Sequence, residues 1–169
     1  NATTAPEVEG TPTPLALRAA LGRFATGVTI VTCRDATGAA VGLTANSFGA
    51  LSLDPPLVLW SLRLNSVSLP AFHGAACFAI NVLSESQVDL SRRFASPVAD
   101  KFAHGPWSEG HDGVPVLSGS AAVFECTTTL RQEAGDHMLF IGQVLRITEA
   151  PLAPLVFQSG RYHMLGEIL

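Results

Sequence analysis

The sequence predicts a mostly β domain, a barrel with a few peripheral α-helices. Three observations predict this fold class. About seven segments carry β-branched and apolar residues, or the alternation of apolar and polar residues, that are typical of strands. Clusters of Gly, Pro and Asp separate these segments and mark turns. Helical spacing of apolar residues occurs only in short stretches, which predicts two or three short helices.

Size and composition favour one soluble domain. The 169 residues are enough for one domain with a core and rather few for two. With 47% hydrophobic and 14% charged residues, the chain is apolar for a monomer, so we expect that much of its surface faces another subunit or a ligand. No stretch approaches ~18 uninterrupted apolar residues, which argues against a membrane span. A net charge of −4 with scattered basic residues argues against nucleic-acid binding.

The N-terminal segment predicts an arm and then a helix. Residues 1–12 are rich in Thr, Pro and Ala and predict a flexible arm, so we assign residues 13–169 to a single domain. Thr13 is a good N-cap and Pro14 suits the first helical position. Leu17, Leu21 and Phe24 follow at helical spacing, and Gly27 is expected to stop this helix.

The next segments predict strands that alternate with turns. We expect strands at residues 28–33 and 40–44, joined by a turn at Asp35–Gly38, then a strand that ends at Asp54, and a strand at residues 57–62 after two prolines. Residues 66–72 suit a short helix, and residues 77–83 suit an apolar strand. Ser84 and Gln87 have the spacing of a capping box, which predicts a helix that runs towards Phe94.

The C-terminal third predicts two hairpins after an irregular segment. Residues 97–119 hold three Pro, four Gly and two His without a period, and we expect a long surface loop there. Residues 121–131 alternate, Glu133–Asp136 suits a turn, and residues 138–148 return, which predicts a long hairpin. Residues 155–157 then turn through Gln158–Gly160 into a last short strand.

Common catalytic motifs are missing from the sequence. There is no Gly-x-Gly-x-x-Gly after a strand, no phosphate-binding loop and no nucleophile elbow, and the five His have no metal-binding spacing. Cys33, Cys77 and Cys126 lie far apart in apolar segments, which predicts buried reduced thiols in a cytoplasmic protein without a signal peptide. For an enzyme, this pattern points to an organic cofactor and to no metal.

Three polar segments are the candidate binding site. The segment Gly42–Phe48 has small side chains at a strand end, where a flat ligand can approach backbone N–H groups, although an ordinary connection fits equally well. Ser61 and Asn65–Ser68 suit a phosphate seat or a simple helix cap. His137, in Gly135-Asp136-His137, suits either an exposed turn or the mouth of a pocket.

Taken in this order, these segments resemble the flavin reductase family with the FMN-binding split β-barrel fold of Greek-key type. The resemblance runs from about Leu17 to Tyr162, nearly the whole chain. The residues that carry it are Phe24–Thr32, Gly42–Leu57, Phe78–Leu83, Asp100-Lys101-Phe102, Gly135-Asp136-His137 and Gly160-Arg161-Tyr162.

The resemblance implies an NAD(P)H:flavin oxidoreductase that transfers a hydride from NADH or NADPH to FMN or FAD. It implies a homodimer that supplies reduced flavin to a partner monooxygenase. The implied ring contacts are Thr44, Ala45, Asn46, Ser47 and Phe48, and the ribityl and phosphate contacts are Ser61, Asn65, Ser66, Val67, Arg93 and Phe94. His137, as the catalytic residue, would lie on the nicotinamide side with Phe157, Gly160 and Tyr162.

Two other functions fit the same fold. One is an oxidase that is similar to pyridoxamine-phosphate oxidase, for which the Gly135-Asp136-His137 turn is not expected. The other is a flavin carrier or electron-transfer module without catalytic activity. Oxidation of NADH that depends on added flavin separates the reductase from both alternatives.

Overall fold

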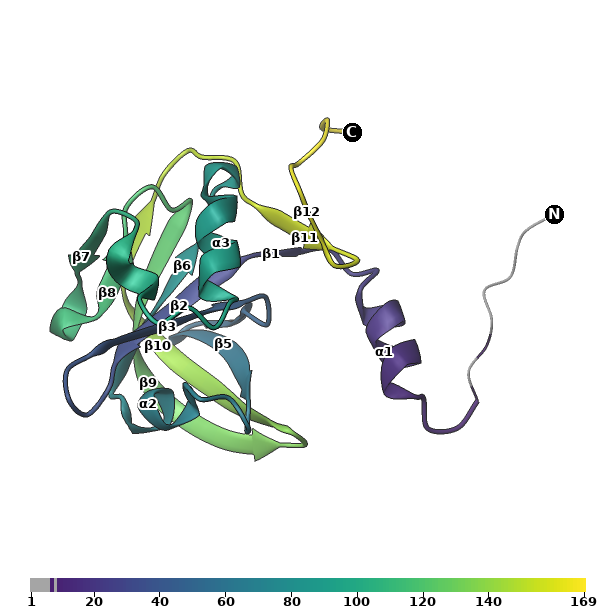
Figure 1. The fold of residues 1–169 in the computed structure, drawn as a ribbon, viewed down its shortest axis with the longest axis horizontal. Helices are drawn as coiled ribbons and strands as arrows, with labels where there is room; N and C mark the ends of the chain where they lie inside the picture. Colours follow the sequence, from purple (N-terminus) through teal and green to yellow (C-terminus); the bar gives the residue numbers. More distant parts are fainter. Residues whose placement is uncertain (1–6, 8) are drawn as a thin grey trace.

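The computed structural model describes residue 7 and residues 9–169. Within these residues the chain forms twelve strands and three α-helices, as the predicted mostly β class requires. Figure 1 shows a curved sheet with the helices at its periphery. Most of the predicted N-terminal arm, residues 1–6 and 8, lies outside the described residues, and residues 9–12 are exposed and form no helix or strand.

One antiparallel sheet of seven strands forms the barrel. In spatial order its strands are β3 (Ala40–Ala45), β2 (Thr29–Arg34), β6 (Cys77–Val82), β9 (Ala122–Ala134), β10 (His137–Glu149), β5 (Pro56–Arg63) and β4 (Gly49–Leu53). β3 and β4 are the two edges of this sheet, so hydrogen bonds do not close the barrel. Residues 46–48 run from one edge strand to the other. They therefore lie at the split, which agrees with the predicted split barrel.

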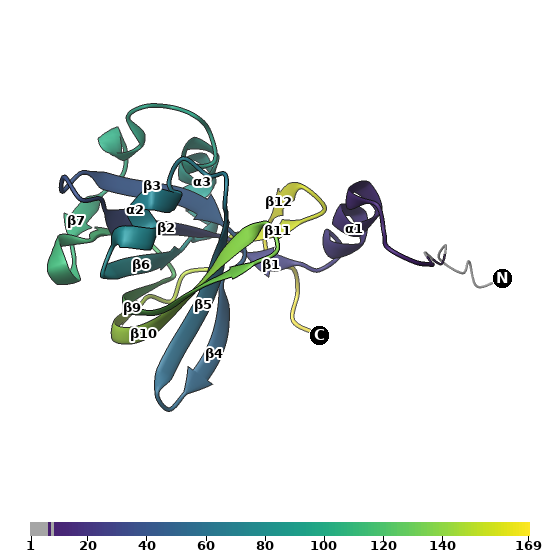
Figure 2. The same cartoon turned by 90° about the horizontal axis from the view of Figure 1, so that it is seen from below.

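Two smaller sheets complete the β structure. β1 (Thr26–Gly27), β11 (Val156–Gln158) and β12 (Arg161–His163) form a three-stranded sheet, and β7 (Trp107–Glu109) pairs with β8 (Pro115–Leu117). Ser159 and Gly160 both have positive φ and make the predicted tight turn between β11 and β12. The three-stranded sheet lies beside the barrel and leads to the N-terminal helix (Figure 2).

The helices confirm two sequence signals and correct one boundary. Helix α1 (Pro14–Leu21) begins as predicted, with Thr13 Oγ1 accepting a hydrogen bond from the Ala16 N–H at 3.2 Å. It ends at Gly22, so the prediction that it continues to Gly27 is wrong. Thr26 and Gly27 pair instead with β11, and the backbone of Ser159 donates to the Gly22 carbonyl. Residues that could have continued the helix pair with a strand instead, so the helix ends earlier than predicted.

The other two helices lie close to their predicted positions. Helix α2 spans Leu69–Gly74, and α3 spans Val88–Phe94 after a 3₁₀ turn at Glu85–Gln87. The predicted capping box is present, since Gln87 Oε1 accepts from the Ser84 N–H at 3.0 Å. Ser68 rather than Asn65 or Ser66 precedes the first residue of α2.

Three apolar clusters stabilise the barrel, and two of them contain the large aromatic side chains. The larger one is built around Trp60, which stacks on Phe140 at 4.8 Å between ring centroids and meets Phe72 and Phe78 edge-on. The second cluster lies under α3 and contains Phe94 and Leu117. Cys33 and Cys126 are buried free thiols, as predicted, and burial raises the pKa of each to about 12, whereas Cys77 is half-buried.

The segment 97–119 is not the predicted surface loop. It contains β7 and β8 and two 3₁₀ turns (Lys101–Ala103 and His111–Gly113), and Val114 and Leu117 are buried. Polar side chains of the barrel hold it in place. Thr32 Oγ1 donates to the Pro115 carbonyl at 2.6 Å, and the Leu117 N–H donates to Asn81 Oδ1 at 2.9 Å. These bonds come from distant strands, so no local pattern in residues 97–119 revealed them.

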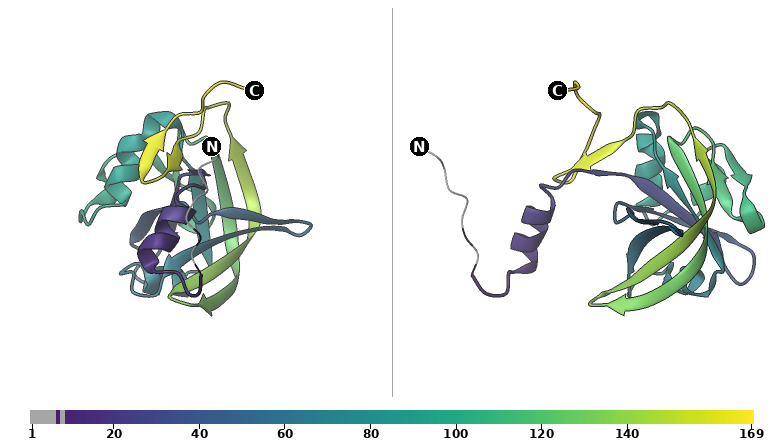
Figure 3. Two further views of the ribbon diagram at one scale, coloured as in Figure 1. Left: turned by 90° about the vertical axis from the view of Figure 1, so that its right-hand side faces the viewer. Right: turned by 180° about the vertical axis from the view of Figure 1, so that it is seen from behind.

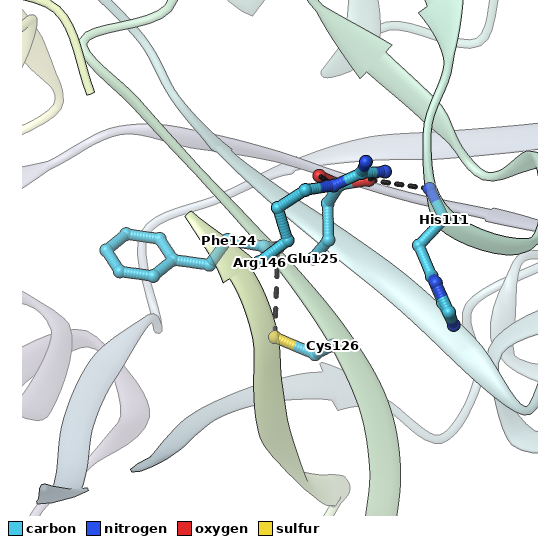
Figure 4. Close-up of polar contacts among 5 residues, drawn as sticks. All are labelled: His111, Phe124, Glu125, Cys126 and Arg146. Atoms are coloured by element: carbon cyan, nitrogen blue, oxygen red, sulfur yellow. Dashed lines mark hydrogen bonds and ion pairs between the residues drawn. The ribbon is translucent and has the colours of Figure 1, made fainter. Parts of the chain in front are cut away.

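A buried carboxylate on the barrel also holds this segment, and it accepts three hydrogen bonds. Glu125 on β9 is 5% exposed, and its oxygens accept from Arg146 at 2.6 and 2.8 Å and from the His111 N–H at 2.6 Å. Figure 4 shows the guanidinium and the His111 backbone meeting this carboxylate. The hydrogen bond from Arg146 is the main reason that the pKa of Glu125 lies below its ordinary value.

Candidate functional site

The predicted ring-binding segment is a fixed strand end at the split of the barrel. Thr44 Oγ1 donates to the Ser91 carbonyl of α3 at 2.6 Å, and Thr29 Oγ1 donates to the Ala45 carbonyl at 2.7 Å. Ser47 Oγ exchanges hydrogen bonds of 3.0 Å with the backbone of Ser61 on β5. The side chains of Thr44 and Ser47 therefore hold the backbone in place, and each hydroxyl already donates its hydrogen bond to a backbone carbonyl of the protein.

The backbone of this segment keeps donors for a ligand. Within the described part of the chain, the N–H groups of Asn46 and Ser47 have no hydrogen-bond partner. The side chains here are small, so a flat molecule can reach these N–H groups. A flavin ring carries carbonyl and nitrogen acceptors at its edge. The donor set at residues 46–47 therefore fits a flavin.

Two pockets meet at this segment and share Thr44, Ala45 and Asn46. The first, which we call the aromatic pocket, has a volume of about 180 Å³ and is completed by Val28, Ala95, Phe157 and Tyr162. The second, the polar pocket, has a volume of about 330 Å³ and is completed by Leu43, Ser47, Ser61, Arg63 and His137. The fold thus brings together nine of the predicted site residues, from positions 44 to 162, around one strand end: Thr44, Ala45, Asn46, Ser47, Ser61, Asn65 at the adjoining rim, His137, Phe157 and Tyr162.

His137 enters the polar pocket from the long hairpin. The turn consists of Gly135 and Asp136, and His137 is the first residue of β10, where it pairs with Arg63 of β5. Its Nδ1 lies 2.7 Å from Asp136 Oδ1, and this hydrogen bond is the main cause that lowers the pKa of Asp136. Nε2 makes no hydrogen bond within residues 7 and 9–169, so it is available to a ligand.

Tyr162 forms a wall of the aromatic pocket, and α3 holds it there. Its hydroxyl lies 2.7 Å from Ser91 Oγ, which is fully buried, and the guanidinium of Arg92 lies 5.4 Å from its ring centroid. Phe157 meets the same ring edge-on at 5.4 Å. Because Thr44 also bonds to Ser91, α3 connects the ring-binding segment to the aromatic wall.

The hydrogen bond between Ser91 and Tyr162 is expected to contribute about 1 kcal/mol to the free energy of unfolding. We expect Ser91→Ala and Tyr162→Phe each to lower that free energy, and the double variant to lose less than the sum of both. Urea denaturation of the four proteins measures the coupling. A coupling energy of zero would show that this hydrogen bond does not hold Tyr162 in place.

Seven predicted site residues lie outside the aromatic and polar pockets, and one of them, Asn65, lines the neighbouring pocket beside α1. Phe48 packs on Phe124 at the barrel, Val67 is 98% exposed, and Ser66 and Gly160 lie in turns. Arg93 donates to the carbonyls of Asp100 and Lys101 and lines a separate pocket with His104.

The position of Phe94 differs most from its predicted role as a contact of the flavin phosphate. It is 1% exposed and packs on Phe102 and Trp107, and a Cβ on Gly42 would lie 2.9 Å from its ring. This side chain belongs to the core, and the structure does not bring it to the aromatic or the polar pocket. Gly42 is small because Phe94 packs directly above it.

Arg63 is the functional candidate that sequence reasoning missed. It lies at the end of β5, is exposed, and lines the polar pocket beside His137. The available signal was a basic residue between Ser61 and Asn65, two positions already considered for a phosphate. Its pairing with His137 depends on the register of β5 and β10, which the sequence alone does not give.

Comparisons with known proteins identify the family of this chain. The family profile described as "Flavin reductase like domain" matches residues 21–166. A "Probable flavin reductase" from Rhizobium meliloti is 50% identical over 149 residues, which are 88% of this chain and 48% of that protein. The chain thus spans about half the length of this relative. "FMN reductase (NADH) SmoA" from Agrobacterium fabrum is 44% identical over 155 residues, 92% of this chain and 88% of that protein.

A solved structure is similar over the same range. The NADH:FAD oxidoreductase SgcE6 from Streptomyces globisporus, in complex with NAD and FAD fragments, superposes with a TM-score of 0.85 at 35% identity. The match covers 90% of this chain and 92% of SgcE6. No helix in the described part of this chain is long and apolar enough to cross a membrane. The fold, the strand end at the barrel split and the family match over residues 21–166 lead to one conclusion: the chain belongs to the flavin reductase family.

Proposed function

We propose that this chain is an NAD(P)H:flavin oxidoreductase that supplies reduced flavin to a partner monooxygenase. One observation supports it above all: two pockets share Thr44–Asn46, and one of them has aromatic walls while the other contains His137 and Arg63. Two adjoining pockets suit two flat molecules held against each other. SmoA, named as an FMN reductase that uses NADH, and SgcE6, named as an NADH:FAD oxidoreductase, have this combination of ligands.

The residues would act by positioning rather than by acid–base chemistry. When bound, a flavin accepts a hydride from the nicotinamide ring of NADH or NADPH. The N–H groups of Asn46 and Ser47 would donate to the ring edge and stabilise negative charge there. Holding the two rings in contact lowers the activation free energy of hydride transfer by several kcal/mol.

The remaining site residues have more peripheral roles in this proposal. Ser61 and Asn65, with Ser66 and Val67 at the rim, would face the ribityl chain and phosphate of the flavin. His137 would contact the nicotinamide nucleotide from the polar pocket, and Phe157 and Tyr162 would contact it from the aromatic pocket, with Gly160 shaping their turn. Buried free thiols at Cys33 and Cys126 suit a reducing compartment, so we place the protein in the cytoplasm.

Replacement of His137 tests the proposal because Nε2 makes no hydrogen bond to any of the residues that the structure describes. We expect His137→Ala to raise the KM for NADH or to slow hydride transfer, while flavin affinity stays nearly unchanged. Loss of a hydrogen bond worth ~1–3 kcal/mol implies a loss of roughly 5- to 150-fold in kcat/KM. Steady-state oxidation of NADH and NADPH with FMN and FAD, followed by absorbance, gives the kinetic constants.

The control is His73→Ala, since His73 is an exposed residue of α2 that lines none of the site pockets. It is expected to leave both kcat/KM and flavin affinity unchanged. Unchanged kinetics in His137→Ala would contradict the role of His137. If the unaltered protein binds flavin but oxidises no NADH or NADPH, it is a flavin carrier and the proposed function is wrong.

We also propose that the protein is a homodimer. Helix α1 buries none of its residues, and Leu15, Leu21 and Phe24 are between 63% and 78% exposed. Figure 3 shows this helix standing away from the barrel. A helix of eight residues is marginal alone, so it needs a partner surface. The interface of the dimer is expected to bury more than ~1,200 Å² in total. Light scattering is expected to give a mass of twice 17.7 kDa, and a monomer at micromolar concentration would contradict the proposal.

A further inference from the structure

Three pockets adjoin one another in the described structure, and we call the three together the groove. The aromatic pocket and the polar pocket share Thr44, Ala45 and Asn46. The polar pocket in turn shares Arg63 and His137 with a third pocket of about 660 Å³, which we call the helix pocket. The ends of the groove are therefore the aromatic pair at one side and helix α1 at the other.

The cationic residues lie in the middle of this groove and on one of its walls. Arg63 borders both the polar and the helix pocket, and Arg18 of α1 lines the helix pocket. Within residues 7 and 9–169, neither guanidinium forms an ion pair. Asp136 is the acidic residue of the helix pocket, and its carboxylate bonds to His137 at 2.7 Å. The two arginines thus keep donors for an anion.

The two ends of the groove suit flat apolar groups. Phe157 and Tyr162 form the wall at one end. Pro14, Leu17 and Leu21 of α1 line the other end, together with Leu64 of the barrel. Apolar ends with cations between them match a molecule that has a ring at each end and an anionic linker in the middle.

We propose that Arg63 binds the pyrophosphate of a dinucleotide whose two rings occupy the ends of this groove, with Arg18 as a second, weaker contact. The inference rests on the proposed function, because both FAD and NAD(P)H are dinucleotides with this linker. A guanidinium donates two parallel hydrogen bonds to phosphate oxygens, which gives it an advantage over an ammonium group. Arg63 is thereby a specificity-determining residue, which favours dinucleotides over mononucleotides.

Equilibrium binding tests this assignment without turnover. Riboflavin, FMN and FAD are titrated by flavin fluorescence, and ADP-ribose, the half of NADH that carries the pyrophosphate, is titrated by calorimetry. The proteins compared are the unaltered chain, Arg63→Gln, Arg63→Lys and Arg18→Gln. Arg23→Gln is the control, since Arg23 is exposed and lines none of the three pockets.

Loss of the charged hydrogen bonds is expected to weaken dinucleotide binding by about 10- to 100-fold in Arg63→Gln. The loss should be smaller in Arg63→Lys and Arg18→Gln and absent in Arg23→Gln. A loss for FAD with FMN and riboflavin unchanged identifies the flavin dinucleotide. A loss for ADP-ribose with all three flavins unchanged identifies the pyridine dinucleotide.

Three results would overturn the inference. Equal losses for FMN and FAD would mean that Arg63 contacts a single phosphate. An equal loss for riboflavin would mean that it only shapes the ring site. Unchanged binding of every probe would mean that it binds no anion. These outcomes differ from failure of the proposed function, in which the unaltered protein binds a dinucleotide but oxidises no NADH or NADPH.

Discussion

Ala45→Leu is expected to weaken flavin binding about 100-fold while the protein stays folded. Ala45 lines both the aromatic and the polar pocket, and its carbonyl is held by Thr29 Oγ1 at 2.7 Å, so the backbone has little freedom to retreat. Three added carbon atoms would fill much of a pocket of about 180 Å³. A steric penalty of about 3 kcal/mol, at the upper end of overpacking costs, corresponds to this loss. Titration of FMN and FAD by fluorescence measures it.

The matched control for this variant is Ala50→Leu. Ala50 is an exposed residue of β4 that lines neither pocket, so the same added side chain should leave flavin affinity unchanged there. Thermal unfolding of both variants checks that folding is preserved. An unchanged dissociation constant in folded Ala45→Leu would mean that the ring binds elsewhere.

The second large effect concerns stability. Glu125→Ala is expected to lower the free energy of unfolding by about 2–3 kcal/mol, because the buried carboxylate accepts three hydrogen bonds. Its loss leaves the His111 N–H without a partner and releases the segment 97–119 from β9. Urea denaturation gives the change. Glu109→Ala is the control, since Glu109 is 77% exposed and its contact with Arg34 is a surface ion pair of 3.5 Å.

The same carboxylate predicts a pH dependence. The hydrogen bond from Arg146 lowers the pKa of Glu125 from its ordinary value of 4.5, so the folded state binds this proton less readily than the unfolded chain. The stabilisation is therefore complete above pH 4.5 and is lost as the pH falls towards the lower pKa of the folded state. Glu125→Gln should flatten this decline between these two pKa values. An equally steep decline in the variant would show that other groups cause it.

Local patterns in the sequence predicted most of the barrel. The alternation in residues 121–131, the turn before His137 and the β-branched residues at 28–33 each record a local preference for strand or turn, and the structure confirms these elements. The caps at Thr13 and Ser84 were predicted for the same reason, since the capping groups lie within three residues of each other.

Features that depend on distant contacts were not predicted. The end of α1 is set by the pairing of Thr26 with Phe157, and residues 97–119 are ordered by Thr32, Asn81 and Glu125 of other strands. Thr32 and Pro115 lie 83 positions apart, and Thr26 and Phe157 lie near opposite ends of the chain. Helical spacing up to Phe24 and a lack of period in 97–119 contain no information about them.

The same distinction between local signals and distant contacts applies to the candidate site. Small polar residues at 44–47 and the turn before His137 are local signals, and the fold places both at the polar pocket. The position of Phe94 depends on its packing above Gly42, and the position of Arg63 depends on strand register. Local signals therefore predicted the individual segments, and the structure added that residues 44–47 and His137 line the same pocket together with Arg63.

Anaerobic mixing of the protein, one equivalent of FMN or FAD, and NADH or NADPH tests the central claim most directly. The proposed function predicts that the visible absorbance of the flavin bleaches at a rate that saturates with the nicotinamide nucleotide and falls when the transferred hydrogen is deuterium. The His137→Ala protein should bleach the flavin more slowly at the same flavin occupancy. Flavin that binds at the pocket formed by Thr44–Ser47 but keeps its absorbance with both nucleotides would contradict the claim.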